Sequence, residues 1–268
     1  MGGSYEQPPA AGGLRLVARR LRTLGVVDGE GLDAFLKRVK VTHGILRGKV
    51  LVSAAHPARH LTLLLDGFAC TCNHHKDGIR QIYTFNYPGD FVGLHRHAFP
   101  HSNDPAEVEA LANCSIGTID NESVDQLLQR HPALALALWR AAMIEANVSR
   151  ERWLAMRRPA LQRVAHLLCE QLVRRLSLGI DNGVIPLSQI EVADAAGLSV
   201  VHTNRIFQDL RKLGALSTKR QTVEIVNKER LQELADFDGR YLDENEFLSR
   251  WNVRIDTGAA RLEVATRH

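Results

Sequence analysis

The spacing of hydrophobic residues changes along the chain, and each change predicts a different kind of element. Residues 14–40 have helical spacing between basic flanks, whereas residues 1–13, rich in glycine and proline, are expected to form a disordered tail. Across residues 41–120, short β-prone runs such as 61–65 and 79–85 are separated by turn signals. The clearest turns are Asp66-Gly67, Asp77-Gly78 and Pro88-Gly89-Asp90. Strands of this kind predict an antiparallel jelly roll or a similar barrel.

From Ser123 onward the pattern becomes helical. Pro132 and Pro159 enclose 26 residues without glycine or proline, enough for a helix about 39 Å long. A further helix is expected over 159–176, because proline at a helix start removes no intrahelical hydrogen bond. Its predicted buried residues are Val164, Leu167, Leu168 and Leu172. A β-rich first half followed by a helical second half predicts an α+β fold.

Residues 187–216 are the most informative part of the chain. They predict two short helices joined at Gly197, the pattern of a helix-turn-helix. Ser188 and Glu191 have the spacing of a capping box, and Ser199 is placed to cap the second helix. The predicted inward residues are Ile190, Val192, Ala193 and Ala196 in the first helix, and Ile206, Leu210 and Leu213 in the second.

The outward side of the second helix predicts DNA binding. Asparagine and arginine can each form two hydrogen bonds to one base edge, so Asn204 and Arg205 are the leading candidates for base contact. The residues expected near or on this face are Ser199, Val200, Val201, His202, Thr203, Asn204, Arg205 and Gln208. An ordinary helical hairpin with a solvated polar face is the alternative. The agreement of caps, turn, core spacing and base-reading residues favours DNA.

Charge supports DNA binding locally rather than globally. The whole chain carries a net charge of only +4, but residues 199–220 alone hold five basic residues against one acidic residue. A local positive patch suits a phosphate backbone, because neutralised phosphates release counterions. A predicted hairpin over 215–226 places Lys219 and Arg220 near its tip, where they would contact phosphates as the wing of a winged helix.

A DNA reader of this kind predicts a homodimer. Two recognition helices must lie about 34 Å apart, one DNA turn, to read a palindrome. The long predicted helix carries a stripe at three- and four-residue steps that could pack on a second copy of itself, or alternatively on its own domain. The stripe comprises Leu134, Ala137, Ala141, Ile144 and Val148.

Composition places further limits on function. The four cysteines form no CxxC pair, no signal-length apolar run begins the chain, and no stretch approaches the roughly 20 apolar residues of a membrane span. We therefore expect a cytoplasmic protein of bacterial type with reduced thiols. Neither a nucleophilic triad, a phosphate-binding glycine loop nor a pair of catalytic carboxylates stands out, so no enzyme activity and no catalytic residue are predicted.

Taken in order, these elements resemble the cyclic AMP receptor/fumarate–nitrate regulator (Crp/Fnr) family of bacterial transcription regulators, over roughly residues 30–237. The β-roll residues that carry the resemblance are 63–68 (LLLDGF), 77–82 (DGIRQI) and 88–93 (PGDFVG), and the helix-turn-helix of 188–213 completes it. The resemblance implies an N-terminal effector domain, a dimer helix and a C-terminal winged helix that enters the major groove.

The resemblance also assigns roles in the recognition helix. Arg205 falls where the family has an arginine that contacts guanine and nearby phosphates. Val201 falls where the family often has a glutamate that reads cytosine, and valine cannot accept that hydrogen bond. The half-site should therefore differ from that of the best-known members, with His202, Thr203 and Asn204 as the expected sources of the difference.

Neither of the family's familiar signals is predicted here. Leu94 follows Gly93 where cyclic AMP binding needs a glutamate, and Asp104-Pro105 aligns with the family's phosphate-binding Arg-Ser pair. An aspartate there would repel the cyclic phosphate. An iron–sulfur cluster needs several N-terminal cysteines, but none precedes Cys70.

Two smaller groups of cysteine and histidine residues could have a function that the resemblance does not assign. Cys70 and Cys72 alternate on one strand ahead of His74-His75, so they could share a metal or an oxidant, although small buried packing residues are the alternative we favour. His95, His97 and His101 follow Gly89 in a pattern that partly resembles the first motif of cupin metalloenzymes. Because the usual glutamate ligand and the second cupin motif are both missing, a polar surface loop is favoured for them.

The sequence thus predicts a Crp/Fnr-type regulator that binds double-stranded DNA as a homodimer, with RNA polymerase as an expected partner and no membrane contact. No cofactor and no metal are predicted, and the signal is unidentified. The alternative is a metal-dependent cupin-like enzyme, or a metal or redox sensor, with an attached DNA-binding module. The expected division is a tail (1–13), a β-roll sensor with flanking helices (14–130), a dimerisation helix (131–158), a winged helix-turn-helix (159–237) and a C-terminal extension (238–268).

Overall fold

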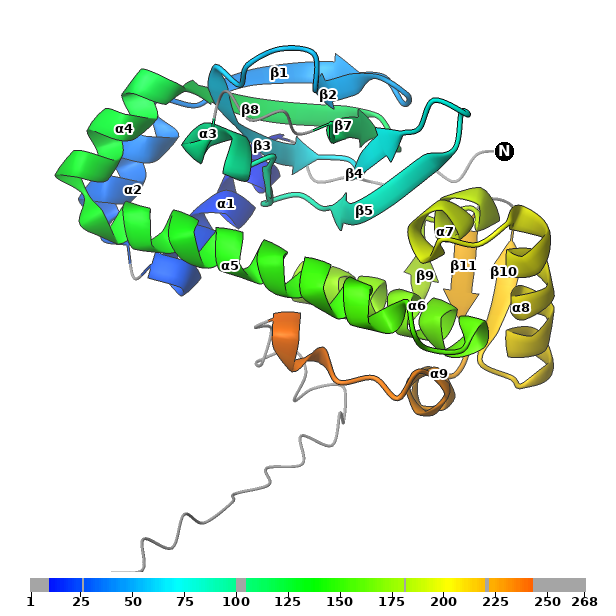
Figure 1. The fold of residues 1–268 in the computed structure, drawn as a ribbon. Coiled ribbons are helices and arrows are strands. Elements are labelled where there is room, and N and C mark those ends of the chain that lie inside the picture. The colour runs from blue at the N-terminus through cyan, green and yellow to red at the C-terminus, as the bar shows by residue number, and fades with distance from the viewer. Residues whose placement is uncertain (1–9, 26, 100–104, 181, 220–221, 243–268) are drawn as a thin grey trace, which may run out of the picture.

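The structure, a computed structural model, describes residues 10–25, 27–99, 105–180, 182–219 and 222–242. Its N-terminal half is a roll of two antiparallel four-stranded sheets, with the orders β1-β8-β3-β6 and β2-β7-β4-β5 (Figure 1). The roll strands are β1 (Lys40–Ile45), β2 (Val50–Val52), β3 (His60–Asp66), β4 (Ala69–His74), β5 (Arg80–Asn86), β6 (Phe91–Val92), β7 (Glu107–Ala110) and β8 (Cys114–Asp120). The predicted jelly roll and both predicted strands are confirmed.

The N-terminal helices differ from the prediction. Two helices, α1 (Ala10–Gly25) and α2 (Gly29–Leu36), replace one helical region, and α1 includes residues 10–13 of the expected tail. The prediction of a disordered tail is wrong for those four residues, and residues 1–9 lie outside the described part. Gly13 explains the error: it is buried against β3, and a Cβ there would lie 2.0 Å from the Leu65 carbonyl oxygen. The absence of a side chain at Gly13 therefore permits α1 to pack closely on β3 and does not indicate disorder.

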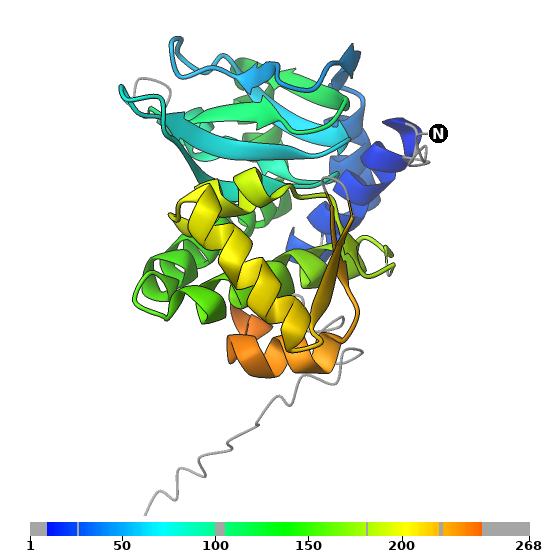
Figure 2. The same cartoon turned by 90° about the vertical axis from the view of Figure 1, so that its right-hand side faces the viewer.

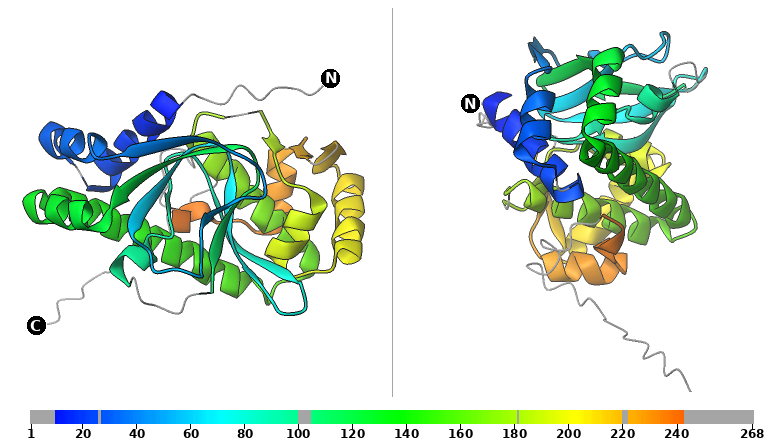
Figure 3. Two further views of the ribbon diagram at one scale, coloured as in Figure 1. Left: turned by 90° about the horizontal axis from the view of Figure 1, so that it is seen from above. Right: turned by 90° about the vertical axis from the view of Figure 1, so that its left-hand side faces the viewer.

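Two helices lead from the roll to α6 (Ala160–Ser177), the first helix of the C-terminal domain. α4 (Asn121–Arg130) is followed by the long α5 (Pro132–Ala155), which runs beneath the roll, and then by α6 (Figures 1 and 3). The four residues of α6 predicted to be buried are all buried. Within the described residues, no helix combines the length and apolar character that a membrane span requires.

The predicted stripe on α5 packs inside its own chain. Leu134, Ala137 and Ala141 belong to a core cluster with α1, α2 and the roll, and Val148 joins the cluster that includes α6. The expectation that this stripe faces a second copy is therefore wrong. Apolar side chains of α1 and the roll already cover that side of α5, so it is not available to a second copy.

The C-terminal domain is built on α6. It contains β9 (Val184–Ile185), α7 (Gln189–Ala196), α8 (Val200–Lys212), β10 (Leu216–Lys219), β11 (Thr222–Ile225), α9 (Lys228–Ala235) and the 3₁₀ helix η1 (Gly239–Leu242). The three strands form a small antiparallel sheet of order β10-β11-β9. Of the C-terminal extension, only residues 238–242 are described.

A buried histidine lies in the core between α6 and the end of the described chain. The His166 ring is 3% exposed and packs against the rings of Phe237 and Tyr241, with centroids 5.0 and 5.9 Å away. Burial, followed by the charge of Arg158, lowers the pKa of His166 to about 4, although Glu170 opposes the shift. His166 is therefore neutral in the folded protein near pH 7.

Candidate nucleic-acid interface

The start of α7 and the turn to α8 form as the sequence predicts. The Ser188 hydroxyl accepts a hydrogen bond from the Glu191 backbone N–H at 3.2 Å, and the Glu191 carboxylate accepts one from the Ser188 backbone N–H at 2.7 Å. Gly197 ends α7 in the left-handed conformation with φ 62°, which glycine adopts without strain. Ser199 then caps α8 by accepting from the His202 backbone N–H at 3.2 Å. These contacts fix the direction of α8 relative to α7.

The buried side of α8 differs in part from the prediction. Ile206 and Leu210 are buried as expected, together with Phe207, which was not among the predicted inward residues and is fully buried. Leu213 is 39% exposed, because it is the C-terminal cap, where the helix ends. In the first helix, Ile190 is 55% exposed and does not face the core.

Thr203 is a further correction. It was predicted on the DNA-facing side, but its side chain is fully buried and its hydroxyl has no hydrogen-bond partner. Position 203 lies three and four residues before Ile206 and Phe207, so it falls on the inward stripe of the helix. Thr203 therefore cannot contact DNA in this conformation.

The other predicted residues of α8 form one exposed face. Figure 2 shows α8 on the side of the molecule that faces the viewer, beside the β10–β11 hairpin. This outward face comprises Ser199, Val200, Val201, His202, Asn204, Arg205 and Gln208, all of which are exposed. It is clear of the roll and of the rest of the C-terminal domain, so a groove of DNA can approach it.

The hairpin beside α8 has the predicted form. Leu216 pairs with Ile225, and Lys219 pairs with Thr222. Lys219 is thus the last residue of β10. Arg220, the other predicted phosphate contact, lies outside the described residues.

A second apolar stripe on α5 is exposed. It consists of Leu136, Trp139, Met143, Ala146, Arg150 and Trp153. These six residues alternate steps of three and four, which gives the seven-residue repeat of a coiled-coil seam. Trp139 and Trp153 are 58% and 77% exposed, which is unusual for side chains of this size. We call this set the α5 seam.

Glu145 lines two of the cavities that lie between the roll and α5. The larger, about 300 Å³, is lined by residues of β4, β5 and α5 together with His95 and Ala106. The smaller, about 40 Å³, extends toward α1 and α6. Glu145 of α5 lines both cavities, and burial raises the pKa of its carboxyl group.

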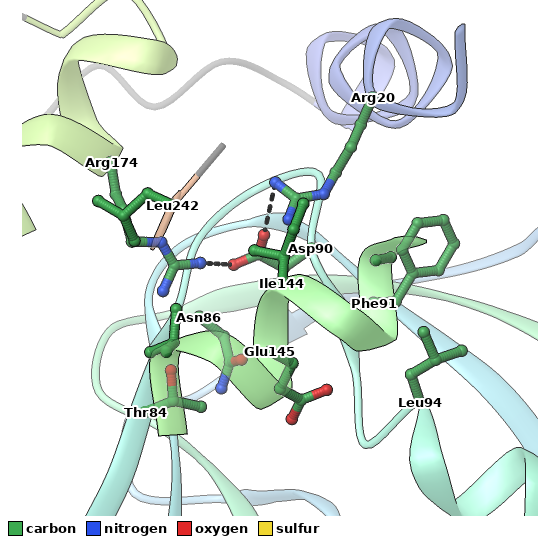
Figure 4. Close-up of a pocket in the computed structure, with 12 residues that line it drawn as sticks. Arg20, Thr84, Asn86, Asp90, Phe91, Leu94, Ile144, Glu145, Arg174 and Leu242 are labelled. Atoms are coloured by element: carbon green, nitrogen blue, oxygen red, sulfur yellow. Dashed lines mark hydrogen bonds and ion pairs between the residues drawn. The ribbon is translucent and has the colours of Figure 1, made fainter. Parts of the chain in front are cut away.

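The arginines around these cavities are engaged elsewhere. Arg20 and Arg174 pair with Asp90 at 3.2 and 2.5 Å, and Figure 4 shows both guanidinium groups converging on Asp90 while the Glu145 carboxylate lies apart from them. Arg96 is buried and donates to the backbone carbonyls of His56 and Ala106. The cavities therefore contain a carboxylate, and the nearby arginines already pair with other protein groups. Both features are unfavourable for the binding of a cyclic phosphate. Asp104, which aligns with the phosphate-binding pair of the family, lies outside the described residues.

The histidine motif does not form a metal site in the described chain. His95 and His97 lie on a short helix, α3 (His95–Ala98), rather than on a strand. His97 contacts Asn121 at 3.0 Å and Asp125 at 3.4 Å, whereas His95 lines the larger cavity. His101 falls outside the described residues. The cupin-like ligand arrangement is therefore not supported.

The cysteine motif, in contrast, does bring ligand atoms together. Cys70 and Cys72 are fully buried, and their sulfur atoms lie with a Glu109 oxygen within 4.8 Å of one another. His74 contacts the same carboxylate, and its Nε2 lies 3.9 Å from the Cys72 sulfur. A hydrogen bond with Cys72 and burial together raise the pKa of the Cys70 thiol. Glu109 was missed because it lies on β7, far along the chain.

Charged contacts dock α7 onto the roll. Arg80 of β5 pairs with Asp194 of α7 at 2.8 Å, and it also pairs with Glu109 at 3.2 Å. Arg47 pairs with Glu191 at 2.9 Å. The helix-turn-helix is thus joined to the roll by pairs that no local sequence pattern predicts.

Comparisons with known proteins agree with this architecture. Two domain families match the sequence: the cyclic nucleotide-binding domain over residues 44–131 and the Crp-like helix-turn-helix domain over residues 162–234. The nitrogen fixation regulation protein FixK of Bradyrhizobium diazoefficiens is 27% identical over 165 residues, which are 59% of this chain and 67% of that protein. The fumarate and nitrate reduction regulatory protein of Vibrio cholerae is 26% identical over 216 residues, 80% of this chain and 84% of that protein.

A solved structure has the same fold. FixK2 from Bradyrhizobium japonicum matches with a TM-score of 0.63 at 24% sequence identity, covering 73% of this chain and 96% of its own. The matched relatives are regulatory proteins. Together with the different surroundings of His95 and His97, this favours a regulator over the cupin-like enzyme.

Proposed function

Because the chain belongs to the Crp/Fnr family of DNA-binding transcription regulators, we propose that it acts as a homodimer on a palindromic operator. Each protomer would insert α8 into the major groove of one half-site. The observation that carries this proposal is the exposed polar face of α8, held by a complete capping box and a left-handed glycine turn. The family consists of transcription regulators, and we propose no enzymatic reaction for this chain.

The α5 seam supports the dimer. Its heptad spacing and its exposed tryptophans suit a parallel pair of helices that cover each other's apolar surface. Arg150 is the one charged position of the six, and it would fix the register of the pair. The two α8 helices would then be placed by the joined α5 helices, so the dimer geometry would set the spacing of the half-sites.

Within α8, we assign base reading to Asn204 and Arg205. Both are exposed and both carry paired hydrogen-bonding groups, and arginine suits the O6 and N7 atoms of guanine. Val201 is 66% exposed, and its methyl groups suit contact with a thymine methyl. The remaining exposed residues contribute to this face, whereas Lys219 and Arg220 would hold phosphates and position the helix without reading sequence.

Activity would depend on a signal received by the roll. A change at the roll or in α5 would alter the relative placement of the two α8 helices and hence the affinity for DNA. We propose the domain boundaries predicted from sequence for this scheme, with the N-terminal boundary moved to include all of α1. RNA polymerase is the expected further partner of the DNA-bound dimer.

A paired measurement tests the assignment of base reading. Arg205→Ala should weaken binding to the operator by about 1–3 kcal/mol and relax preference at one base pair, while random DNA is bound almost as before. Lys219→Ala should weaken both DNAs alike and lower the salt dependence by about one unit of slope. Fluorescence anisotropy over a series of salt concentrations measures both effects. Equal losses on operator and random DNA for Arg205→Ala would exclude Arg205 as a base reader.

A further inference from the structure

One cluster of ligand-type side chains lies on the face of the roll that meets α7. Cys70, Cys72 and His74 alternate along β4, so they project from the same face of its sheet. On one side, Glu109 of β7 stands opposite Cys70, and on the other side Arg80 of β5 stands opposite His74. The register of three adjacent strands therefore brings two thiols, an imidazole and a carboxylate to one place.

We propose that Cys70, Cys72, His74 and Glu109 bind one divalent cation of the zinc class. Two sulfurs, one nitrogen and one oxygen form a ligand set that zinc accepts in tetrahedral geometry. On binding, each cysteine releases its proton to solvent and the cation takes the place of both protons, with no change of oxidation state. The net charge of the cluster is then unchanged, which suits a site of low polarity.

The distances among these ligand atoms are close to those that a cation needs. Bonds of about 2.3 Å to sulfur hold the two sulfurs of a tetrahedral zinc site about 3.8 Å apart. The Cys70 and Cys72 sulfurs lie within 4.8 Å of each other and of the Glu109 oxygen, and His74 lies 3.9 Å from the Cys72 sulfur. His74 lies outside the group of atoms that are all within 4.8 Å of one another, so its side chain must rotate toward Cys70 on binding, with the His74–Glu109 hydrogen bond opening in exchange.

The cluster also has an entrance. Both cysteines are fully buried, but the His74 side chain is 47% exposed and the Glu109 side chain 14%. A hydrated cation can therefore meet His74 and Glu109 first and exchange its water for the thiolates afterwards. Cys114 and Cys169, in contrast, are buried without a second sulfur or histidine in a cluster of this kind among the described residues.

Arg80 couples the cluster to the DNA-binding domain, a step that rests on the proposed function. Its guanidinium lies between Glu109 of the cluster and Asp194 of α7, at 3.2 and 2.8 Å. A cation that binds the Glu109 carboxylate would weaken the pair between Glu109 and Arg80. Arg80 would then pair with Asp194 alone. The docking of α7 on the roll, and with it the placement of α8, therefore differs between the metal-free and metal-bound protein.

Metal binding can be measured without DNA. Titration of the full-length, reduced protein with Co²⁺ should give one equivalent per chain with thiolate-to-cobalt charge-transfer and tetrahedral d–d absorption, and Zn²⁺ should displace it. Cys72→Ser and His74→Ala should each lower the affinity at least about tenfold. The matched controls Cys169→Ser and His75→Ala should leave it unchanged. Absence of charge-transfer absorption in the folded protein, or equal affinity in variants and controls, would overturn the site.

A second measurement tests the coupling. Zn²⁺ at saturation should change operator affinity at least about fivefold, and Asp194→Asn should remove that change while it retains the cobalt spectrum. Unchanged operator affinity with a normal spectrum would overturn the coupling through Arg80 but leave the metal site. Failure of the metal-free protein and of the zinc-loaded protein alike to prefer any palindrome would instead overturn the proposed function.

Discussion

Replacing Trp139 by alanine tests whether the α5 seam joins two protomers. Trp139 is the second of the six seam residues and is 58% exposed in the single chain. A tryptophan side chain offers at most about 250 Å², so up to about 145 Å² is available to a partner. At about 25 cal/mol per Å², covering half of this area contributes about 2 kcal/mol per protomer.

Because the dimer is symmetric, the residue counts twice, and the expected loss is about 4 kcal/mol. This loss raises the dissociation constant of the dimer about a thousandfold. Sedimentation equilibrium at several loading concentrations measures that constant directly. Circular dichroism should show the helical content unchanged, because more than half of the Trp139 side chain is exposed in the single chain.

Ile79→Ala is the matched control for Trp139→Ala. Ile79 is 60% exposed but lies in the turn before β5, away from the seam. Its replacement should leave the dissociation constant within about twofold of the parent value. If Trp139→Ala dimerises as tightly as the control, then the seam does not form the dimer interface and the argument from its heptad spacing fails.

Three other predictions concern stability. Phe207→Ala removes a fully buried ring, so urea melts should show a loss of about 3–5 kcal/mol, whereas a loss under 1 kcal/mol would mean that the core of α8 is loose. Ser188→Ala should cost about 1 kcal/mol, and Ser188→Asp should restore most of it if capping is the cause. The ordinary pKa of His166 is 6.5 and its folded value is about 4, so the stability present above pH 6.5 should fall by up to about 3 kcal/mol as the pH drops toward 4. His166→Gln should remove this decline, and an unchanged pH profile would show that His166 does not cause it.

The sequence predicted the elements whose signals are local. Ser188, Glu191, Gly197 and Ser199 all act within one helical turn of their own positions, and all behave as predicted. The strands of the roll are likewise separated by turns whose glycines and aspartates are visible in the sequence. Local hydrogen bonds and backbone preferences of this kind need no knowledge of the rest of the fold.

The sequence-based predictions were wrong where contacts between residues far apart in the chain decide which side of a helix is buried. α5 carries two apolar stripes with the same three- and four-residue steps, and hydropathy cannot tell which one covers α1 and the roll. Thr203 was predicted on the DNA-facing side, although its spacing with Ile206 and Phe207 indicates the inward side. Periodicity was the stronger signal there, because helix geometry fixes which residues share a face.

One ligand of the candidate metal cluster could not be predicted from the sequence. The cysteines and His74 are adjacent in sequence, but Glu109 joins them only through the pairing of β4 with β7. Strand register of this kind depends on the whole sheet, so a ligand supplied by a neighbouring strand is invisible to a search for spaced motifs.

The two oxygens of Glu191 have separate tasks. One accepts from the Ser188 backbone N–H and completes the start of α7, while the other receives the guanidinium of Arg47, whose side chain is 54% exposed. Water and salt can thus displace Arg47 while the helix start stays intact. We therefore expect the contribution of Arg47 to the docking of α7 to weaken as ionic strength rises, while the Arg80–Asp194 pair and the shared apolar core continue to hold the C-terminal domain on the roll.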